Sequence, residues 1–400
     1  MGNEARPPAI LYFGNDWFAE NRTSSHHIAR QLADEGYEVY YIECPGLHIP
    51  KGTGRDLKKI GAKLFRFLQG ATPVAPRLKI RTLLQIPFHR FGLVRRLNRA
   101  LILATVNGMM RREGINRPIS WFVIPHLSPI VGRLGERLSV YYCTDDYASL
   151  PNVDVEAVRA MDEDLTRRAD LVFVTSDALF GPKQLLNPRT YVSPHGVDVE
   201  HFARAQNEQL AIPADVAGLP RPIVGFFGLI GRQIDLDLID YLAEKRPSWT
   251  FLLIGRVSVP AEQIPRRPNI HMVGKRPYQD LPAYGKRFDA AIIPYRPSQF
   301  ALYANPLKLR EYLAMGKPIV AVSTPEIDKF ADVVKIAHSR EEFLARLDEV
   351  LARPSSADEA RRRMDRVASS SWEARRREIL DVVENHLDAR RDEEKVVASF

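Results

Sequence analysis

The chain has 400 residues, of which 45% are hydrophobic and 26% charged, and carries a formal net charge of +8. This size and composition predict two globular domains, or three at most, each with its own core. The two cysteines, Cys44 and Cys143, are too few and too far apart for a disulfide framework or a zinc site, so we expect a reducing compartment. The longest apolar run, residues 100–106, is far shorter than the ~20 residues of a membrane span, and neither an export signal nor a lipidation motif is visible, so we expect a soluble or peripheral cytoplasmic protein.

In the first half of the chain, short β-branched and aromatic runs alternate with helical patterns. The runs predicted to be strands are AILYFG, YEVYYIE, ISWFVIP, SVYYCT, DLVFVTS and TYVSP. Helices are predicted over residues 24–35 and 154–168. Near-continuous apolar strands joined by helices indicate a parallel sheet covered on both faces.

The segment GNDWFAENRTSSHH, residues 14–27, is predicted to be a loop that opens the first helix. Arg22 and Ser24 are candidates for contact with an acceptor or a diphosphate. His26, or its neighbour His27, is a candidate for a group that titrates near neutral pH. A solvated N-terminal turn is the alternative.

Positive charge is concentrated between Lys51 and Arg117, where 16 Lys and Arg stand against two acidic residues. This stretch carries +14, which leaves −6 for the rest of the chain. It forms most of a segment, residues 46–117, that we call the basic insert.

Two amphipathic helices are predicted inside the basic insert. Their apolar stripes are Leu57, Ile60, Leu64 and Phe67 or Leu68 in the first, and Leu93, Leu97 and Leu101 in the second, against Arg95, Arg96 and Arg99. Such helices either lie on anionic lipid, where each basic residue adds about 1 kcal/mol, or face the core with a solvated basic side. Nucleic acid is not a predicted partner, because no recognition module or aromatic platform is present.

Asp145 and Asp146 follow the apolar run SVYYCT and should project from the carboxyl end of that strand into a cleft. Two adjacent carboxylates repel each other, so one of them can have a raised pKa suited to a general base. Asp146 is slightly favoured for this role. Capping of the next helix is the alternative for both.

A polar, proline-bearing stretch, residues 203–222, is predicted to be a linker. The strand pattern then restarts with IVGFFG, TFLLIG, IHMVG, AAIIPY, PIVAVS and VVKIA, and the tail SSSWEARRREILDVVENHLDARR is one amphipathic helix. The predicted fold class is α/β, with two tandem Rossmann-like, doubly wound parallel-sheet domains and an interdomain cleft. The predicted limits are residues 1–205 for the first domain, 206–370 for the second and 371–400 for the closing helix, with the option that it packs back on the first domain.

His195 and Gly196, in SPHGVD, are predicted to form a turn at the edge between the domains. Gly196 would need a positive φ there. His195 is a further candidate for a residue at the cleft.

The glycine-rich fingerprints of dinucleotide-binding and P-loop proteins are absent, so neither class is predicted. Gly228 and Gly231 follow the first strand of the second domain, where glycine lets the backbone approach a diphosphate that Arg232 could neutralise. A tight turn with a surface arginine is the alternative.

The stretch ALYANPLKLREYLAMGKPIVAV, residues 301–322, places a lysine near the start of a short helix. Asn305 is predicted to be the N-cap and Gly316 to end the helix. Lys308 then lies in the first turn, where it repels the helix dipole unless an anion is bound. Glu311, one turn further on, could accept hydrogen bonds from a ribose diol, so the pair indicates a nucleotide site. A weak exposed Lys–Glu pair is the alternative.

The run NPLKLREYLAMGKPIVA closely resembles the donor-binding segment of glycosyltransferases of the GT-B fold, in which Pro-x-Lys-x-x-Glu grips a nucleotide sugar. VYYCTDDY, DLTRRADLVFVTSDAL and YVSPHGVDVEHF resemble the acceptor-domain end of these enzymes, and SSSWEARRREIL resembles their closing helix. The resemblance covers most of the chain except the basic insert. It is strongest for family-4-like bacterial exopolysaccharide and teichuronic-acid transferases and xanthan-type glucuronosyltransferases. Many retaining members carry a second glutamate where this chain has Tyr303, so retention of configuration is not implied.

The resemblance implies a hexosyl- or glucuronosyltransferase that moves a sugar from a nucleotide-diphosphate donor, expected to be a UDP-sugar, to a lipid-linked or polysaccharide acceptor. It would act in cell-surface polysaccharide biosynthesis, at the inner face of the cytoplasmic membrane, with residues 51–117 on the anionic membrane surface. The implied donor-binding residues are Gly228, Gly231, Arg232, Asn305, Lys308 and Glu311, and the acceptor-side residues are Arg22, Ser24, His26 and His195. An aspartate base, Asp146 or Asp145, would imply inversion by direct displacement.

No cofactor and no metal are expected. The aspartates of DED, Asp162 and Asp164, lie in a helical pattern in which they point about 200° apart, so they do not form a metal-binding pair. Two alternatives to a glycosyltransferase remain open: a sugar-nucleotide epimerase of the same fold, and a non-catalytic nucleotide- or polyanion-binding adaptor.

Overall fold

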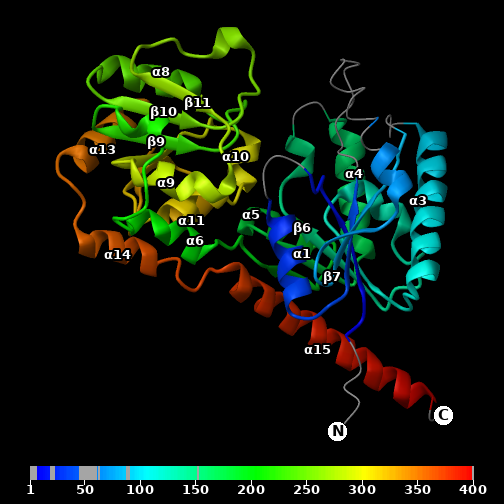
Figure 1. Cartoon of the computed structure of the whole chain (residues 1–400). Helices are drawn as coiled ribbons and strands as arrows, with labels where there is room; N and C mark the ends of the chain where they lie inside the picture. The colour runs from blue at the N-terminus through cyan, green and yellow to red at the C-terminus, as the bar shows by residue number, and fades with distance from the viewer. Residues whose placement is uncertain are drawn as a thin grey trace. The chain divides into compact units, whose positions relative to one another are not determined.

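The computed structural model of the chain describes residues 7–18, 23–44, 61, 64–86, 91–150 and 153–398 (Figure 1). The chain forms two units, each with its own sheet. Unit 1 comprises Met1–Pro194 and Arg376–Phe400, and unit 2 comprises His195–Arg375. The predicted fold class, two doubly wound α/β domains, is confirmed. No helix within the described residues is both long and apolar enough to cross a membrane.

The sheet of unit 1 has the strand order β3-β4-β2-β1-β5-β6-β7-β8. Its strands are β1 (Ile10–Gly14), β2 (Val39–Glu43), β3 (Thr72–Ala75), β4 (Leu78–Thr82), β5 (Ile119–Phe122), β6 (Leu138–Cys143), β7 (Leu171–Val174) and β8 (Thr190–Val192). All pairs are parallel except β3 with β4. The central strands are buried along their whole length, as near-continuous apolar runs predict.

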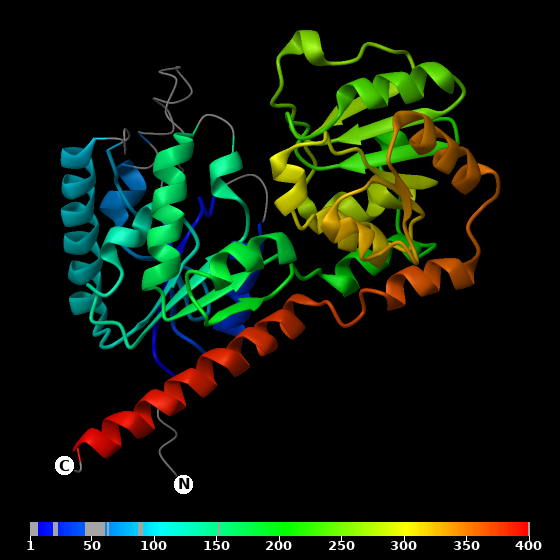
Figure 2. The same ribbon diagram turned by 180° about the vertical axis from the view of Figure 1, so that it is seen from behind.

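Helices and short 3-10 turns cover both faces of this sheet (Figures 1 and 2). They are α1 (Ser24–Asp34), α3 (Gly92–Glu113), η1 (Pro125–Ile130), η2 (Tyr147–Ser149), α4 (Val155–Arg168), α5 (Asp177–Gln184) and α15 (Trp372–Ala398), of which unit 1 holds the part from Arg376. The predicted helices at 24–35 and 154–168 are therefore present. The closing helix packs on unit 1 through ion pairs such as Arg376 with Glu35, at 2.6 Å.

The basic insert is part of the sheet rather than an addition to it. Sequence reasoning missed β3 and β4, which lie in the insert, and β4 pairs in parallel with β2. Helix α3 then carries the chain across to β5. In LKIRT the buried residues Leu78, Ile80 and Thr82 alternate with the half-buried Lys79 and Arg81. This period-two alternation is the signal of a strand that could have revealed β4.

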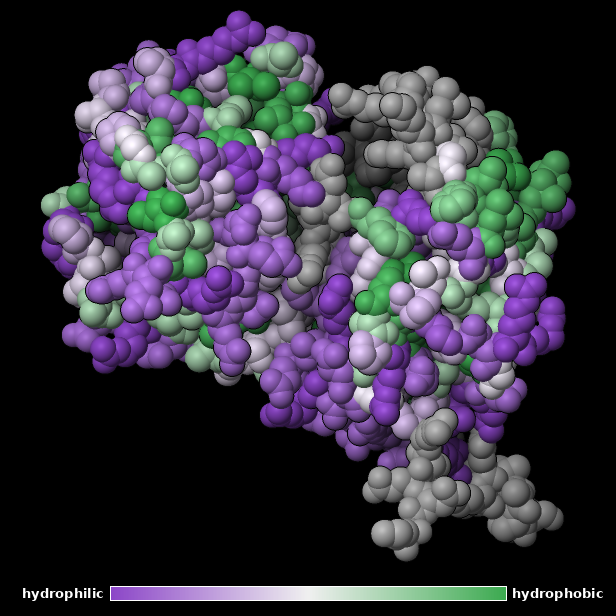
Figure 3. Space-filling model, viewed as in Figure 1, coloured by the Kyte–Doolittle hydropathy of each residue, from purple (hydrophilic) through white to green (hydrophobic). Residues whose placement is uncertain are grey.

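Helix α3 buries a different face from the predicted apolar stripe. Its buried residues are Asn98, Ile102, Val106, Met109 and Met110. The predicted stripe is exposed instead, with exposed fractions of 69% for Leu93, 50% for Leu97 and 38% for Leu101. The core-facing alternative for these leucines is therefore wrong. Hydrophobic residues show on the surface in Figure 3 where Figure 1 places α3.

The other predicted amphipathic helix of the basic insert falls partly outside the described residues, which leaves Leu57 and Ile60 without a structural account. Residues 64–69 are helical. Leu64, Phe65 and Leu68 are exposed there, as the leucines of α3 are.

The sheet of unit 2 has the order β11-β10-β9-β12-β13-β14 and is parallel throughout. Its strands are β9 (Ile223–Phe227), β10 (Thr250–Ile254), β11 (Ile270–Gly274), β12 (Ala290–Ile293), β13 (Ile319–Val322) and β14 (Lys335–Ala337). Its helices are α6 (Val199–Ala203), α7 (Ala214–Ala217), α8 (Leu236–Lys245), α9 (Leu281–Lys286), α10 (Gln299–Tyr303), α11 (Leu307–Ala314), α12 (Pro325–Asp328), α13 (Arg340–Leu351) and α14 (Ala357–Asp365).

The stretch predicted as a linker, residues 203–222, is packed into unit 2. The Lys286 ammonium donates hydrogen bonds to the carbonyl oxygens of Asn207, Glu208 and Leu210, at 2.7–2.9 Å. Val216 is fully buried in the core of the unit. The linker prediction is wrong because contacts with residues distant in sequence, such as Lys286, fix this stretch to unit 2, and no local pattern reveals them.

Candidate functional site

The strand order of each sheet defines where a ligand crevice forms. In unit 2 the chain leaves β9 toward β10 on one side, and β12 leads to β13 on the other. Neighbouring strands whose connections leave in opposite directions open a crevice at their carboxyl ends. That crevice is bordered by the loop after β9, which begins with Gly228, and by the loop after β12, which contains Tyr295.

Helix α11 presents its N-terminus to this crevice. The hydroxyl of Tyr312 accepts a hydrogen bond of 2.9 Å from the backbone N–H of Phe227, the last residue of β9. Both residues are buried, so the bond fixes the helix against the end of the strand. Lys308 is the second residue of α11 and lies in the first turn, as predicted.

The predicted N-cap is wrong by one residue, because Pro306 and not Asn305 caps α11. The buried Asn305 amide instead donates to Glu326 Oε2 at 2.8 Å and accepts from Arg310 at 2.5 Å. Asn305 therefore ties the start of α11 to α12. Glu326 was not singled out from the sequence, since only the fold brings α12 next to Asn305.

Lys308 meets the glycine loop directly. Gly228 has φ +135°, and a Cβ added there would lie 3.2 Å from Lys308 Cε. The ammonium donates to the Tyr295 hydroxyl at 3.3 Å and lies 5.2 Å from the centre of that ring. Among the ion pairs of the described residues none includes Lys308. A cation at a helix N-terminus, without a carboxylate partner in its own unit, is a place for an anion.

Glu311 lies one turn beyond Lys308 and is partly buried. Burial raises its pKa to about 7, against the opposing effect of the Lys308 charge. The two side chains are not joined in any ion pair of the described residues, so the exposed Lys–Glu pair considered from the sequence is not what the structure contains. With a pKa of about 7, the Glu311 carboxyl is instead divided between its protonated and ionised forms at neutral pH.

Two further glycines shape the same loop. A Cβ at Gly231 would lie 2.5 Å from Gln233 Oε1, so a side chain there would displace the end of the Gln233 side chain. Gly255, which sequence reasoning missed, has φ +152°, and a Cβ there would lie 1.8 Å from the carbonyl oxygen of Gly228. Its place directly after the apolar run TFLLI is the signal that could have found it.

Arg232, predicted to neutralise a diphosphate, is exposed. It lines a hollow of about 750 Å³ in unit 2, together with residues that include Asp237, Glu262 and Arg296. Lys308 and Glu311 do not line that hollow. Of the predicted donor-binding residues, Gly228 and Lys308 meet directly, and Glu311 lies one turn from Lys308 in the same helix.

Unit 1 has its own crevice position between β1 and β5, whose connections also leave in opposite directions. Ser24 and His26 lie there, at the start of α1 after the β1 loop, and both are buried. His26 Nδ1 accepts from the Thr23 N–H at 3.0 Å, and Nε2 pairs with the Asp16 carbonyl at 3.1 Å. These two hydrogen bonds require the neutral Nε2–H tautomer of His26. They join the start of α1 to the loop after β1. Arg22 lies outside the described residues.

Asp145 and Asp146 follow β6, as predicted, and have different environments. Asp146 accepts from the Ala148 N–H at 3.3 Å and caps η2, which is the structural role considered as its alternative. Burial raises the pKa of Asp145 to about 7; the Thr144 hydroxyl lowers it and the charge of Asp146 raises it further. The two carboxylates are therefore not interchangeable.

His126 was missed by sequence reasoning. It lies in η1, four residues after the end of β5 at Phe122, and is buried. It follows an apolar strand in ISWFVIPH, just as the aspartates follow SVYYC, and this parallel is the signal that could have found it.

His195 and Gly196 belong to unit 2. The prediction that Gly196 needs a positive φ is wrong, since Gly196 is not among the residues with positive φ. Glycine is required there because a Cβ would lie 2.8 Å from the ring of Trp372. His195 is buried, with its ring centre 6.2 Å from that of Trp372.

The aspartates of the DED run have separate partners. Asp162 accepts from the Lys183 ammonium at 2.6 Å, whereas Asp164 pairs with Arg168 at 2.8 Å. Nowhere in the described part of the chain do three or more His, Cys, Asp or Glu side chains lie so that they could hold a metal ion.

Comparison with known proteins defines the class. Residues 221–353 match the family model of glycosyl transferases group 1. The fold resembles sucrose-phosphate synthase from Thermosynechococcus elongatus, with a TM-score of 0.68, 16% identity, and coverage of 96% of this chain and 100% of that chain. Residues 221–353 therefore form a glycosyl transferases group 1 domain, and the two sheets have the GT-B fold. The resemblance seen in the sequence is confirmed.

A particular relative comes from Bacillus subtilis (strain 168) and carries the name of a teichuronic acid biosynthesis glycosyltransferase, TuaH. It is 25% identical over 397 residues, which cover 93% of this chain and 95% of the relative. A further structural neighbour is Anabaena Alr3699/HepE in complex with UDP and glucose, with a TM-score of 0.64, 14% identity, and coverage of 94% of this chain and 100% of that chain.

Proposed function

We propose that the protein transfers a hexosyl or glucuronosyl group from a UDP-sugar to a lipid-linked or polysaccharide acceptor in cell-surface polysaccharide biosynthesis. The observation that carries the proposal is the Lys308 ammonium at the N-terminus of α11, beside Gly228 and without a carboxylate partner in the described part of unit 2. The structural neighbour from Anabaena is named as a complex with UDP and glucose, and a second neighbour, from E. coli, as bound with UDP-2-fluoro glucose. The B. subtilis relative is named for teichuronic acid biosynthesis.

In this proposal unit 2 holds the donor. The loop of Gly228 and Gly231 lets the backbone approach the diphosphate, and the Lys308 ammonium pairs with its oxygens. Glu311 accepts hydrogen bonds from the ribose hydroxyls, for which its ionised form is suited. As the sugar leaves, charge builds on the diphosphate, and Lys308 with the dipole of α11 stabilises it without a metal ion.

Unit 1 supplies the general base. We assign this role to Asp145 rather than Asp146, because Asp146 caps η2 whereas the pKa of Asp145 is raised to about 7 by burial. At neutral pH a sizeable fraction of Asp145 is ionised and can take the proton of an acceptor hydroxyl. The hydroxyl oxygen then bonds to the anomeric carbon as the bond to UDP breaks, which inverts the configuration.

The basic insert would place the enzyme on the inner face of the cytoplasmic membrane. Sixteen large apolar side chains are markedly exposed among the described residues, and nine of them lie in the insert. They include Phe65, Leu68 and Leu93, each more than 60% exposed. Exposed apolar groups among basic ones suit an anionic lipid surface, where burial and charge both contribute.

The test is a transfer assay with purified protein, a panel of UDP-sugars and anionic membrane vesicles that contain extracted lipid-linked saccharides. The proposal expects UDP release that depends on the vesicles, and loss of at least about a hundredfold in Asp145→Asn, the scale of general-base catalysis, with UDP binding kept. An epimerase would convert the UDP-sugar without vesicles. A non-catalytic adaptor would bind UDP but would release no UDP from any UDP-sugar. Conversion without vesicles, or binding without UDP release, would contradict the proposal.

A further inference from the structure

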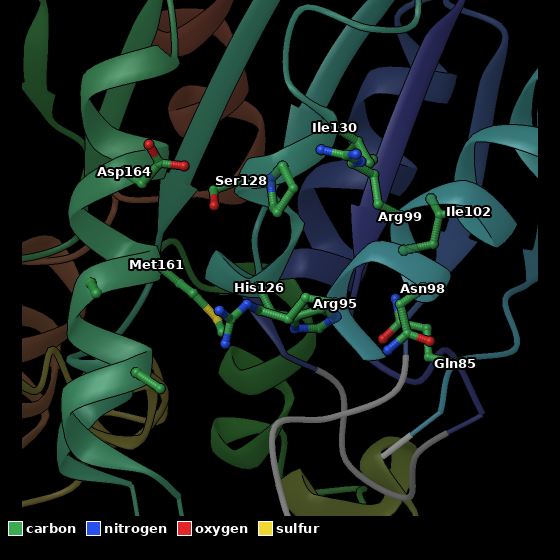
Figure 4. A pocket seen from close by; sticks show the side chains of 13 residues that line it. Gln85, Arg95, Asn98, Arg99, Ile102, His126, Ser128, Ile130, Met161 and Asp164 are labelled. Carbon is green, nitrogen blue, oxygen red and sulfur yellow. The ribbon is translucent and has the colours of Figure 1, made fainter. Parts of the chain in front are cut away.

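A cavity of about 310 Å³ lies in unit 1 between α3, η1 and α4. Figure 4 shows side chains of α3 on one side, Met161 and Asp164 of α4 on the other, and His126 and Ser128 of η1 between them. Because η1 follows β5 at the crevice position of the sheet, the cavity lies at the edge where doubly wound sheets bind ligands.

The cavity carries positive charge from two arginines of α3, one of which, Arg99, has no ion pair among the described residues. Arg95 and Arg99 line it from α3, and Asp164 lines it from α4. Asp164 is already paired with Arg168, at 2.8 Å. Arg99 takes part in none of the ion pairs of the described residues. An anion would therefore find the Arg99 guanidinium group, whose fork geometry suits phosphate oxygens.

A buried amide at the cavity points to a ligand independently. Neither Nε2 nor Oε1 of Gln85 has a hydrogen-bond partner in the described chain, although both atoms are buried. Its neighbour in the lining, Asn98, shows the usual state, with hydrogen bonds of 2.8 and 2.9 Å to the backbone of Ile86. Buried polar atoms almost always have partners, so the Gln85 amide is suited to a polar group that enters the cavity.

The cavity also has an apolar exit. An adjoining hollow of about 440 Å³ shares Arg95, Arg99 and Pro129 with it and adds Leu93. Leu93, which is 69% exposed, begins the exposed leucine stripe of α3. A phosphate held inside would thus have an apolar surface next to it for a hydrocarbon chain.

We propose that this cavity binds the phosphate or diphosphate group of an amphiphilic acceptor, whose apolar chain leaves along the exposed leucines of α3. The inference rests on the proposed function and adds the class of acceptor and the residues that hold it. Arg95 and Arg99 bind the phosphate oxygens, and the Gln85 amide donates to one of them.

The test is calorimetric titration of the full chain with farnesyl diphosphate, inorganic diphosphate and farnesol. Farnesyl diphosphate should bind at least tenfold more tightly than either of the other two, a difference of about 1.4 kcal/mol or more. Arg99→Leu should weaken that binding at least tenfold. The matched control is Arg111→Leu, which removes the same charge from the exposed end of the same helix and should change binding less than about twofold.

Gln85→Leu separates a binding role from a packing role. It should weaken farnesyl diphosphate binding without lowering the melting temperature, because the variant loses a buried amide that has no partner among the described residues. A variant that only unfolds more easily would show the opposite pattern and would overturn this assignment. Equal losses of farnesyl diphosphate affinity in Arg99→Leu and Arg111→Leu would mean that the ligand is attracted only by the general positive charge of the helix. That result would overturn the proposed binding site.

A UDP titration of the same preparations keeps this inference separate from the proposed function. If UDP binds to wild type and farnesyl diphosphate does not, the cavity inference is wrong and the donor site stands. If farnesyl diphosphate binds with the expected dependence on Arg99 while UDP does not bind, the donor proposal fails and the cavity remains a lipid-phosphate site.

Discussion

Replacing Lys308 by methionine removes the charge at the start of α11 and keeps most of the side-chain stem. The stem lies between the rings of Phe226 and Tyr295, with the ammonium 5.5 Å and 5.2 Å from their centres, so Met should preserve the packing. Two unit charges about 4 Å apart attract by about 4 kcal/mol at an effective dielectric constant of about 20. Desolvation offsets part of this attraction, and hydrogen bonds to charged groups contribute about 1.5–3 kcal/mol net. We therefore expect UDP to bind about 10- to 150-fold more weakly to Lys308→Met, at about 1.4 kcal/mol per tenfold.

Calorimetric titration with UDP, UMP and uridine measures which part of the nucleotide accounts for the loss of affinity in Lys308→Met. If Lys308 binds the diphosphate, its replacement lowers the affinity for UDP most. It leaves the affinity for uridine, which has no phosphate, unchanged. The control is Lys245→Met, an exposed lysine in the last turn of α8, at the opposite edge of the same sheet. UDP affinity like that of wild type, or an equal loss for uridine and UDP, would refute the assignment of Lys308 to the diphosphate.

Three further predictions concern the pH dependence of stability, membrane contact and the glycine loop. Burial raises the pKa of Asp145 from 3.8 and of Glu311 from 4.5, each to about 7, so the folded chain keeps protons that the unfolded chain loses, and stability falls as pH rises through this window. Asp145→Asn and Glu311→Gln should therefore raise the melting temperature more at pH 8 than at pH 5, and an equal shift at both would contradict the burial argument. Leu93→Ser with Leu97→Ser should weaken sedimentation with phosphatidylglycerol vesicles about tenfold or more, since a fully buried leucine contributes about 1.5–3 kcal/mol; Leu185→Ser, 89% exposed and outside the basic insert, should not. Gly255→Ala should lose about 3 kcal/mol or more of unfolding free energy in urea, from strain at φ +152° and a clash with Gly228, whereas Gly218→Ala, with no atom within 4 Å of its Cβ, should change by about 0.5 kcal/mol or less.

The sequence by itself determined the local elements. Runs such as AILYFG and IVGFFG are apolar along their whole length, as strands with both faces buried must be. These runs form β1 and β9. The placement of Lys308 in the first turn of a helix also followed from local signals, although the cap fell one residue later than expected. The resemblance to GT-B glycosyltransferases rested on the same short runs.

Only the tertiary structure decided which residues meet and which faces are buried. Gly228 and Lys308 are far apart in the chain and meet because Tyr312 binds the end of β9. Helix α3 has apolar residues around much of its surface, so its periodicity could not tell the buried Ile102 side from the exposed Leu93 side. Gly196 is required by the ring of Trp372 rather than by its own backbone angle. Local patterns record what a segment can form, whereas burial, close approach and a raised pKa depend on neighbours that the fold brings from elsewhere in the chain.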